Sequence, residues 1–214
     1  MRTIIIPAGG KATRFGGILK ELLPINATDT PLLRALQNAV IGFDADEVLV
    51  ISSLDKIKEH AYYVGRNMAH AAPFIRYSIT TSDNLWEALD DVMPLHDGGI
   101  VLADTVTFVE PQQITAPLVF GVFKTFQPER FSVIRNDTII TKQPMLNAGH
   151  SLAWGVVLWS KEVVDYWRKH QYETYDDAFR DAMRVFGYAT FDLPYYYDLG
   201  SFEAYVEFLK ENHG

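Results

Sequence analysis

The sequence predicts an α/β protein with a mostly parallel central sheet flanked by helices and a small β-rich portion in its second half. Up to about residue 116, short runs of β-branched and aliphatic residues alternate with segments of helical period. Beyond residue 117, apolar runs follow one another with little helix between them. With 214 residues, of which 48% are hydrophobic, the chain can bury one substantial core. We therefore expect a single domain over 1–214, with halves at 1–116 and 117–214.

The first half predicts an alternating β-α-β-α-β order. Buried parallel strands are expected at residues 3–7, 47–52 and 99–103, where the runs TIIIP, EVLVIS and GIVLA are mainly aliphatic. Helices are expected at residues 31–43, 55–69 and 84–92. In the first of these helices, Leu32, Leu36 and Ala39 fall on one face, as in an amphipathic helix that covers a sheet.

The second half predicts a group of strands followed by helices. The apolar runs are LVFGVFK, RFSVIR, TIITK and AWGVVLW, and Asn136-Asp137 between two of them suits a tight hairpin turn. Helices are expected at residues 161–169, 175–186 and 202–210. Because no linker-like segment separates the halves, we expect them to share one core.

The composition indicates a protein of the cytoplasm. The formal net charge is -8, and lysine and arginine are not clustered as on a nucleic-acid-binding face. The chain has no cysteine, which disfavours disulfides, thiolate metal sites and thiol catalysis. No apolar run reaches the length of a signal peptide or a membrane span. We therefore expect neither nucleic acid nor a membrane as a partner.

The segment PAGGKATRFGGILKELLP, residues 7–24, directly follows the first expected strand. Gly9 and Gly10 would free backbone N–H groups for phosphate oxygens, and Arg14 could bind such oxygens with two hydrogen bonds. Lys20 adds a second cation. The segment has neither the Walker ending nor the G-x-G-x-x-G spacing of a dinucleotide site. On these residues alone, a phosphate-binding loop and a structural turn remain equally open.

Three further polar residues stand at the ends of apolar runs, where α/β sheets bind their ligands. Asp104 follows VLA and could be a Mg²⁺ ligand, or could end the strand in a turn. Asp198 precedes Gly200 and Ser201, a sequence that also suits a turn and a helix cap. Lys142 in TKQP could bind an anion or be a solvated lysine.

Taken in order along almost the whole chain, these segments resemble motifs of the sugar-phosphate nucleotidyltransferase family, the NDP-sugar pyrophosphorylases. AGGKATRF with KELLP is similar to the family's A-G-G-x-G-T-R-L and K-x-L-L-P signature, and TSDNLWEAL resembles its base-reading segment. VLADT stands where the family has V-L-x-G-D-N, and QPERFSVI is close to its D-P-x-R hairpin. TKQP and YYDLGSFEAY resemble its E-K-P and W-x-D-x-G-T motifs. The resemblance implies a short, single-domain member with a Rossmann-like, glycosyltransferase-A-like fold.

The resemblance also implies a role for each half of the chain. The first half would bind the nucleotide through residues of the glycine loop and of the base-reading segment: Ala8, Gly9, Gly10, Thr13, Arg14, Lys20, Ser82, Asn84 and Leu85. The second half would bind the acceptor through Lys142, Asn147 and Trp154. Asp104 and Asp198 would hold Mg²⁺ as the cofactor, and the catalytic residues would be Arg14, Lys20 and Asp104.

Several positions depart from the family pattern. Ala12 and Trp86 stand where the family usually has glycine, so the loop at Ala12 must avoid a positive φ or accept strain, and the pocket near Trp86 is expected to be unusual. Gln127, Thr141 and Gln143 replace residues of the D-P-x-R and E-K-P motifs. The interval from Arg14 to Lys20 is shorter than in glucose-1-phosphate enzymes and closer to that of cytidylyltransferases.

The resemblance implies transfer of a nucleoside monophosphate from an NTP, expected to be a pyrimidine nucleotide, to a sugar 1-phosphate with release of pyrophosphate. The short Arg14 to Lys20 interval keeps open a cytidylyltransferase for a non-sugar acceptor such as phosphocholine or a phosphonate. The altered glycine and pocket positions keep open a nucleotide-binding protein without turnover. A homo-oligomer is a further open possibility.

Overall fold

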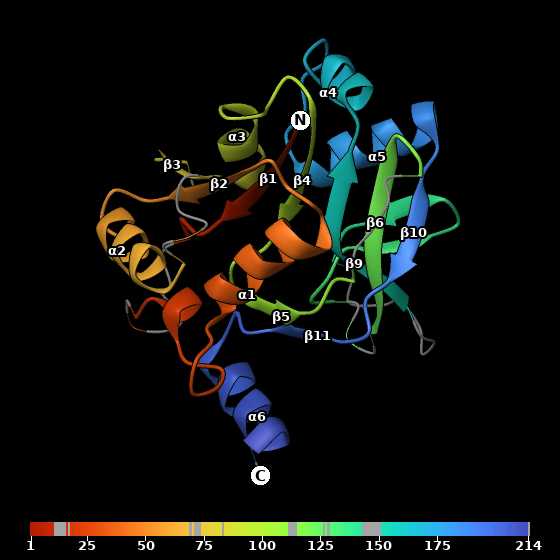
Figure 1. Cartoon of the computed structure of the whole chain (residues 1–214). Helices are drawn as coiled ribbons and strands as arrows, with labels where there is room; N and C mark the ends of the chain where they lie inside the picture. Colours follow the sequence, from red (N-terminus) through yellow and green to blue (C-terminus); the bar gives the residue numbers. More distant parts are fainter. Residues whose placement is uncertain are drawn as a thin grey trace.

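The computed structural model describes residues 1–10, 16, 18–68, 70, 74–82, 84–110, 115–125, 127, 129–142 and 151–213. Within these residues, nine strands form one large sheet (Figure 1). Seven of them lie side by side in the order β10-β6-β9-β4-β1-β2-β3. Their bounds are β1 (Arg2–Pro7), β2 (Glu47–Ser52), β3 (Ile75–Ile79), β4 (Asp97–Val101), β6 (Leu118–Thr125), β9 (Ser151–Trp159) and β10 (Ala189–Asp192).

The central part of the sheet is parallel, as the sequence predicts. β1 pairs in parallel with β2 and β4, and β2 pairs in parallel with β3. β9 runs antiparallel between β4 and β6, and β10 returns parallel to β6. The hairpin of β7 (Val133–Arg135) and β8 (Thr138–Ile140) belongs to the same sheet because β7 pairs with β9. The expected fold class, a mostly parallel sheet flanked by helices, is confirmed.

Alternate side chains of β1 enter two separate cores on the two faces of the sheet. Ile4 and Ile6 pack in the same cluster as residues of α1 (Pro31–Gln37) and α2 (Ile57–Asn67). Ile5 packs in a second cluster, together with residues of α3 (Leu85–Asp90), α4 (Lys161–Trp167) and α5 (Tyr175–Phe186). The molecule therefore has three layers, with helices on both faces of the sheet (Figure 1).

A second, two-stranded sheet lies beside the large one. It pairs β5 (Thr105–Thr107) with β11 (Tyr196–Asp198) in antiparallel fashion. A small apolar cluster joins it to α6 (Phe202–His213), whose Tyr205 and Phe208 pack with Val106 and Ile25. In Figure 1, α6 extends away from this sheet toward the C-terminus.

For the buried elements of the protein, the expected bounds agree closely with the observed ones. The strand over 47–52 and the helix over 175–186 have the expected bounds. Asn136 and Asp137 form the hairpin turn between β7 and β8, and both have positive φ, 50° and 55°, as a type I′ turn requires. The strand expected at 99–103 instead spans Asp97–Val101, so Asp104 lies between β4 and β5 rather than directly after a strand. Strands β3, β5, β10 and β11 were not predicted.

The helix expected at 31–43 changes form before its end. The α-helix stops at Gln37, and a π-helical turn, η3 (Asn38–Gly42), completes the segment. Asn38 is buried, and its amide donates to the carbonyl of Thr107 at 3.1 Å and accepts from the N–H of Val109 at 3.1 Å. These two bonds tie the π-helical turn to the segment that includes and follows β5.

Among the described residues, no helix combines the length and apolar character needed to cross a membrane.

Candidate active site

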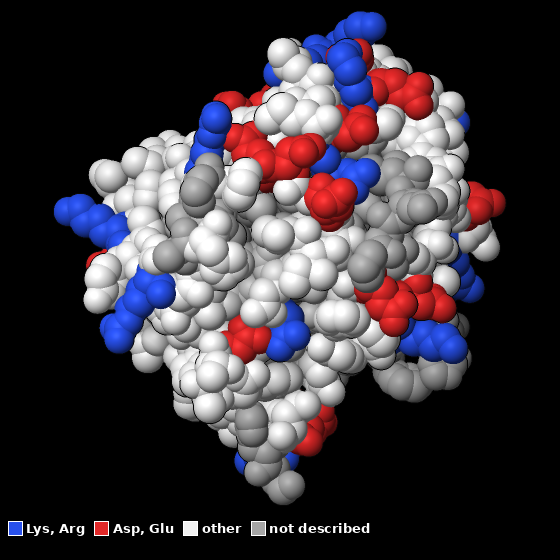
Figure 2. All heavy atoms as spheres, in the orientation of Figure 1, with Lys and Arg blue, Asp and Glu red and all other residues white. Residues whose placement is uncertain are grey.

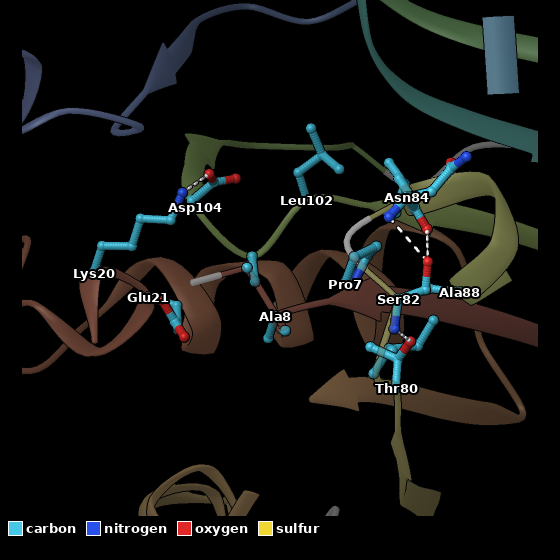
Figure 3. Close-up of a pocket in the computed structure, with 15 residues that line it drawn as sticks. Pro7, Ala8, Lys20, Glu21, Thr80, Ser82, Asn84, Ala88, Leu102 and Asp104 are labelled. Carbon is cyan, nitrogen blue, oxygen red and sulfur yellow. Dashed lines mark hydrogen bonds and ion pairs between the residues drawn. The ribbon is translucent and has the colours of Figure 1, made fainter. Parts of the chain in front are cut away.

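A pocket of about 390 Å³ opens at the carboxyl ends of the parallel strands. It is lined by residues that follow three of them, among them Gly9 and Gly10 after β1, Thr80 after β3 and Asp104 beyond β4. Figure 3 shows Lys20 and Asp104 at one end of this pocket and Ser82 and Asn84 at the other. We call it the first pocket. Its position is the one that α/β sheets use for ligands.

The glycine loop contributes its first residues to the first pocket. A Cβ on Gly9 would lie 3.1 Å from Cγ2 of Thr80, so glycine allows the loop to pass close to the segment after β3. Gly10 has no such restriction, because a Cβ at this position would meet nothing within 4 Å. Thr13, Arg14 and the unusual Ala12 lie outside the described residues. Their expected roles stay predictions.

Lys20 and Asp104 form an ion pair at the polar end of the first pocket (Figure 3). Lys20 opens the short 3₁₀ helix η2 (Lys20–Leu22), and Asp104 precedes β5, so two segments far apart in sequence meet here. The expectation that both residues belong to one site agrees with this geometry. An ammonium group at this place can also neutralise a phosphate group.

The residues expected to read the base line the first pocket, but their side chains are already engaged. Asn84 caps α3 by accepting from the N–H of Trp86 at 2.9 Å, and it donates to the carbonyl of Glu173 at 3.0 Å. Ser82 donates to a carboxylate oxygen of Glu87 at 2.6 Å. Leu85 supplies apolar lining. The polar side chains of Ser82 and Asn84 are therefore held by protein partners at this end of the first pocket, and the hydroxyl of Thr80 accepts from the N–H of Ser82 at 3.1 Å.

A second pocket, of about 220 Å³, adjoins the first and shares Lys20, Leu102 and Asp104 with it. It is lined by Asp198, by the cations Arg130 and Lys142, and by four aromatic residues, Phe131, Trp154, Tyr175 and Tyr196. Of the expected acceptor residues, Lys142 and Trp154 thus lie here. Asn147 lies outside the described residues.

The small sheet brings the two expected metal ligands together. Asp198 pairs with Thr105, the residue after Asp104, and the N–H of Leu199 donates to the carbonyl of Asp104 at 2.9 Å. Burial, and then the negative charges of Asp104 and Asp198, raise the pKa of the Tyr196 hydroxyl well above its ordinary value. The negative charges of Asp104 and Asp198 therefore both lie near Tyr196 in the second pocket. This juxtaposition depends on β5 and β11, which were not predicted.

Each of these carboxylates has a cation of the protein as its partner. Asp104 pairs with Lys20, and Asp198 accepts from Nη2 of Arg130 at 2.9 Å. The described residues contain no cluster of three histidine, cysteine or acidic side chains that could hold a metal. Two carboxylates in one pocket nevertheless supply the hard oxygen donors that Mg²⁺ prefers, and phosphate oxygens and water can complete its shell. The carboxylate oxygens of Asp104 and Asp198 thus fit the expected Mg²⁺ once Lys20 and Arg130 move away from them.

Sequence reasoning missed two parts of the site and expected one residue, Trp86, that lines neither pocket. Arg130 belongs to the QPERFSVI segment, yet it was not assigned to the acceptor pocket that it lines. Glu21, Lys56 and His60 form a buried polar cluster behind the glycine loop. Because Glu21 is far from the other two residues in sequence, no local pattern predicts the cluster. Trp86 was expected near a ligand pocket, but it is buried against Trp167 and Tyr172 and lines neither the first nor the second pocket.

Charged side chains of both signs are spread over the surface shown in Figure 2. Among the described residues on this face, basic side chains are dispersed among acidic ones and form no continuous basic patch. The described cations that line the two pockets are Lys20, Arg130 and Lys142.

Fold and site together define a three-layered α/β protein with two joined pockets at the carboxyl edge of its sheet. No family model matches the sequence, and no curated protein matches it either. The likeness to known proteins lies in the structure.

Two solved structures resemble the whole chain. A protein of Bacillus anthracis assigned as a glucose-1-phosphate thymidylyltransferase, solved with sucrose, has a TM-score of 0.81 and 15% identity, over 99% of this chain and 95% of that one. A UDP-glucose pyrophosphorylase solved with UDP-glucose has a TM-score of 0.77 and 17% identity, over 100% of this chain and 98% of that one. Both neighbours bear names from the family that the motifs resemble. The expected Rossmann-like fold is thereby confirmed.

Proposed function

We propose that the protein is a Mg²⁺-dependent nucleotidylyltransferase that transfers NMP from an NTP to a sugar 1-phosphate and releases pyrophosphate. The observation that carries the proposal is the junction of the two pockets at Lys20 and Asp104. A nucleotide in the first pocket and a phosphorylated acceptor in the second would bring their phosphates together at this point. The names of the structural neighbours, which include UDP-glucose as a bound ligand, support the same reaction class.

The reaction needs positioning and charge neutralisation more than covalent chemistry. An oxygen of the acceptor phosphate attacks the α-phosphorus, and the bond from this phosphorus to the oxygen that bridges to the β-phosphate breaks. Lys20 at the junction would polarise the α-phosphate, and Lys142 and Arg130 would orient the acceptor phosphate. Arg14, from the sequence pattern, would stabilise the departing pyrophosphate. Backbone N–H groups around Gly9 would hold phosphate oxygens.

Asp104 and Asp198 are the residues that would hold Mg²⁺ in this reaction. When bound, the ion lowers the repulsion between the two phosphate groups. In the free protein, Lys20 and Arg130 neutralise the two carboxylates. Binding of phosphates would draw both cations toward the ligands and leave the carboxylates free. This exchange would supply local positive charge to an anionic substrate in a protein whose net charge is negative.

The experiment is an assay of pyrophosphate release over the common NTPs and dTTP, each with a panel of sugar 1-phosphates and Mg²⁺. The proposal expects one nucleotide and sugar pair to exceed the others clearly. Nucleotide binding without turnover on any acceptor would instead support a non-catalytic nucleotide-binding protein. Binding of no nucleotide at all would contradict both functions.

A second candidate acceptor is phosphocholine, or a related non-sugar phosphate or phosphonate, with CTP as the donor. The aromatic side chains that line the second pocket favour including it, because aromatic faces bind quaternary ammonium groups. Turnover with CTP and phosphocholine, and none with sugar 1-phosphates, would favour the non-sugar acceptor over the sugar 1-phosphate.

A further inference from the structure

Behind the first pocket lies a buried polar cluster, made of Ser52, Lys56, His60 and Glu21, that the proposed reaction does not use. Their relative exposed areas are 0%, 3%, 0% and 1%. Ser52 ends β2, Lys56 and His60 lie at the start of α2 and within it, and Glu21 belongs to η2. Charged and polar side chains are rarely buried to this extent without a specific reason.

Hydrogen bonds connect the cluster into one chain of contacts. Oε1 of Glu21 accepts from Nζ of Lys56 at 3.1 Å and lies 2.9 Å from Nε2 of His60. Nδ1 of His60 lies 2.9 Å from Oγ of Ser52. Nζ of Lys56 also donates to the carbonyl oxygen of Gly10. The cluster thus ends on the backbone of the glycine loop.

The charges of the cluster balance if His60 is neutral. The Glu21 carboxylate then compensates the Lys56 ammonium, and an additional buried charge on His60 would carry a large desolvation penalty. In this state Nε2–H of His60 donates to Glu21, and Nδ1 accepts from the Ser52 hydroxyl. Ser52, His60 and Glu21 have the order of a nucleophile triad, but Ser52 is fully buried and lines neither pocket.

The cluster fixes two parts of the first pocket relative to each other. Lys56 holds the carbonyl of Gly10, the last described residue in the first part of the loop, through a hydrogen bond from its ammonium. Glu21 is held by the same ammonium and directly follows Lys20 in η2. Gly10, Lys20 and Glu21 all line the first pocket. One buried cation therefore links the loop backbone to the turn that presents Lys20.

We propose that Lys56 is a positioning residue of the nucleotide site, and that Glu21, supported by His60 and Ser52, holds its ammonium in place. Lys56 contacts the Gly10 carbonyl and so sets the loop backbone against Lys20 before any ligand binds. This inference rests on the proposed function, because it assumes that the first pocket binds a nucleoside triphosphate. A purely stabilising ion pair would need only Glu21 and Lys56, whereas the contact with Gly10 ties the pair to the pocket.

The test separates positioning from stability with a pair of substitutions. Lys56→Met removes the ammonium and leaves the buried charge of Glu21 with the hydrogen bond from His60 but without a cation, so this single variant is expected to have a lower melting temperature. Lys56→Met combined with Glu21→Gln removes both charges, and the melting temperature is expected to recover in large part. The contact with Gly10 stays absent in both variants. Lys58→Met, on an exposed position of the same helix, is the matched control.

Binding of ATP, CTP, GTP, UTP and dTTP, each with Mg²⁺, is measured by calorimetry for all variants. The double variant is expected to bind the preferred nucleotide about tenfold more weakly than wild type despite its recovered stability, with Lys58→Met unchanged. Wild-type affinity in the double variant would overturn the inference and leave the proposed function standing. If wild type binds none of the nucleotides, the proposed function fails, and the inference fails with it.

A second substitution keeps the test decisive if the double variant does not fold. His60→Gln weakens the hold on Glu21 but leaves the contact between Lys56 and Gly10, so it should lower the melting temperature with nucleotide affinity within about twofold of wild type. Lys56→Met should lower both. Equal losses of nucleotide affinity in His60→Gln and Lys56→Met would show that only the stability of the cluster matters and would overturn the inference.

Discussion

Lys20 and Glu21 are neighbours in sequence but have opposite environments. Lys20 reaches Asp104 at the junction of the two pockets, whereas Glu21 is buried on Lys56 and His60. The sequence identified Lys20 because it stands in a motif with glycines and an arginine. It gave no sign of the role of Glu21, because the partners of this carboxylate lie 35 and 39 residues further along the chain. A charge whose partner is distant in sequence carries no local pattern.

At Asp104, replacement by asparagine should abolish most turnover and leave the fold intact. Asparagine has nearly the same shape but cannot supply the negative charge that holds Mg²⁺, so kcat is expected to fall by at least about a hundredfold. Pyrophosphate release measures this loss, and circular dichroism checks the fold. Asp90→Asn, at an exposed position, is the control. Near-normal turnover in Asp104→Asn would contradict the metal assignment.

At Glu21, stability should depend on pH in the acid range. Burial by itself would raise the pKa of this carboxyl, but the hydrogen bond from His60 and the charge of Lys56 outweigh burial and lower the pKa below its ordinary value of 4.5. A group with a lowered pKa stabilises the folded state fully above its ordinary value and loses this effect as the pH falls through the folded-state value.

The corresponding experiment compares wild type with Glu21→Gln by urea unfolding. Near neutral pH the variant should be less stable by about 3–5 kcal/mol, because Lys56 is left buried without its partner. This difference should stay constant down to about pH 5 and then shrink with further acidification. A difference that does not change down to about pH 3 would contradict the assigned ionisation of Glu21.

Among the elements, β5 and β11 decide the geometry of the site although they are among the shortest. They hold Asp104 and Asp198 side by side, and Tyr196 of β11 packs flat on Phe123 of β6 with ring centroids 4.1 Å apart. A Cβ on Gly155 of β9 would lie only 2.2 Å from the ring of Tyr196. The close approach of β9 to β11 therefore depends on glycine at this position.

Gly155→Ala should consequently displace Tyr196 and, with it, Asp198. The expected effects are a loss of about 1–3 kcal/mol in the free energy of unfolding and a fall in kcat, measured by urea unfolding and pyrophosphate release. Gly65→Ala in α2 is the matched control, because nothing lies within 4 Å of the added Cβ, and it should be neutral or slightly stabilising. Equal effects of Gly155→Ala and Gly65→Ala on stability and kcat would contradict the inference that the packing of Tyr196 needs glycine at position 155.

The elements that the sequence predicted well are those with a strong hydrophobic pattern. β1 and β2 are nearly continuous aliphatic runs because the sheet buries both of their faces. β3, in contrast, is an outer strand with the sequence IRYSI, in which Arg76 and Ile79 are exposed. β5 and β11 have three residues each, too few for a periodic signal. These elements are specified by pairing with distant strands rather than by their own sequence.

At the scale of the whole molecule, the two joined pockets take their lining residues from both halves of the chain. The first pocket is lined by residues of the first half, and the second pocket adds Arg130, Trp154 and Asp198 from the second half. The order of motifs along the chain predicted that Asp104 and Asp198 belong together. It did not predict how they meet, because the contact is created by strand pairing over more than ninety residues.

A ligand that occupies both pockets should stabilise the protein more than either of its parts. At a concentration of about 100 times its Kd, a ligand adds about 2.7 kcal/mol, which for a protein of this size raises Tm by roughly 5–10 °C. UDP-glucose and dTDP-glucose are the first compounds to compare with the matching NTP and with glucose 1-phosphate in thermal unfolding. A nucleotide sugar that shifts Tm no more than its separate parts would contradict one continuous site.

The antiparallel strand β9 has a consequence for how the chain is made. Gly98 to Val101 of β4 pair with Val156 to Trp159 of β9, and β9 in turn carries β6. While the ribosome is still adding residues before 159, the β4 edge of the nascent parallel sheet has no partner, and the completed β6 has nowhere to dock. Unpaired edges of this kind can join with other chains. Until β9 is made, the nascent chain therefore keeps an open edge of the kind that can aggregate, and truncation before β9 would leave the β4 edge without its partner.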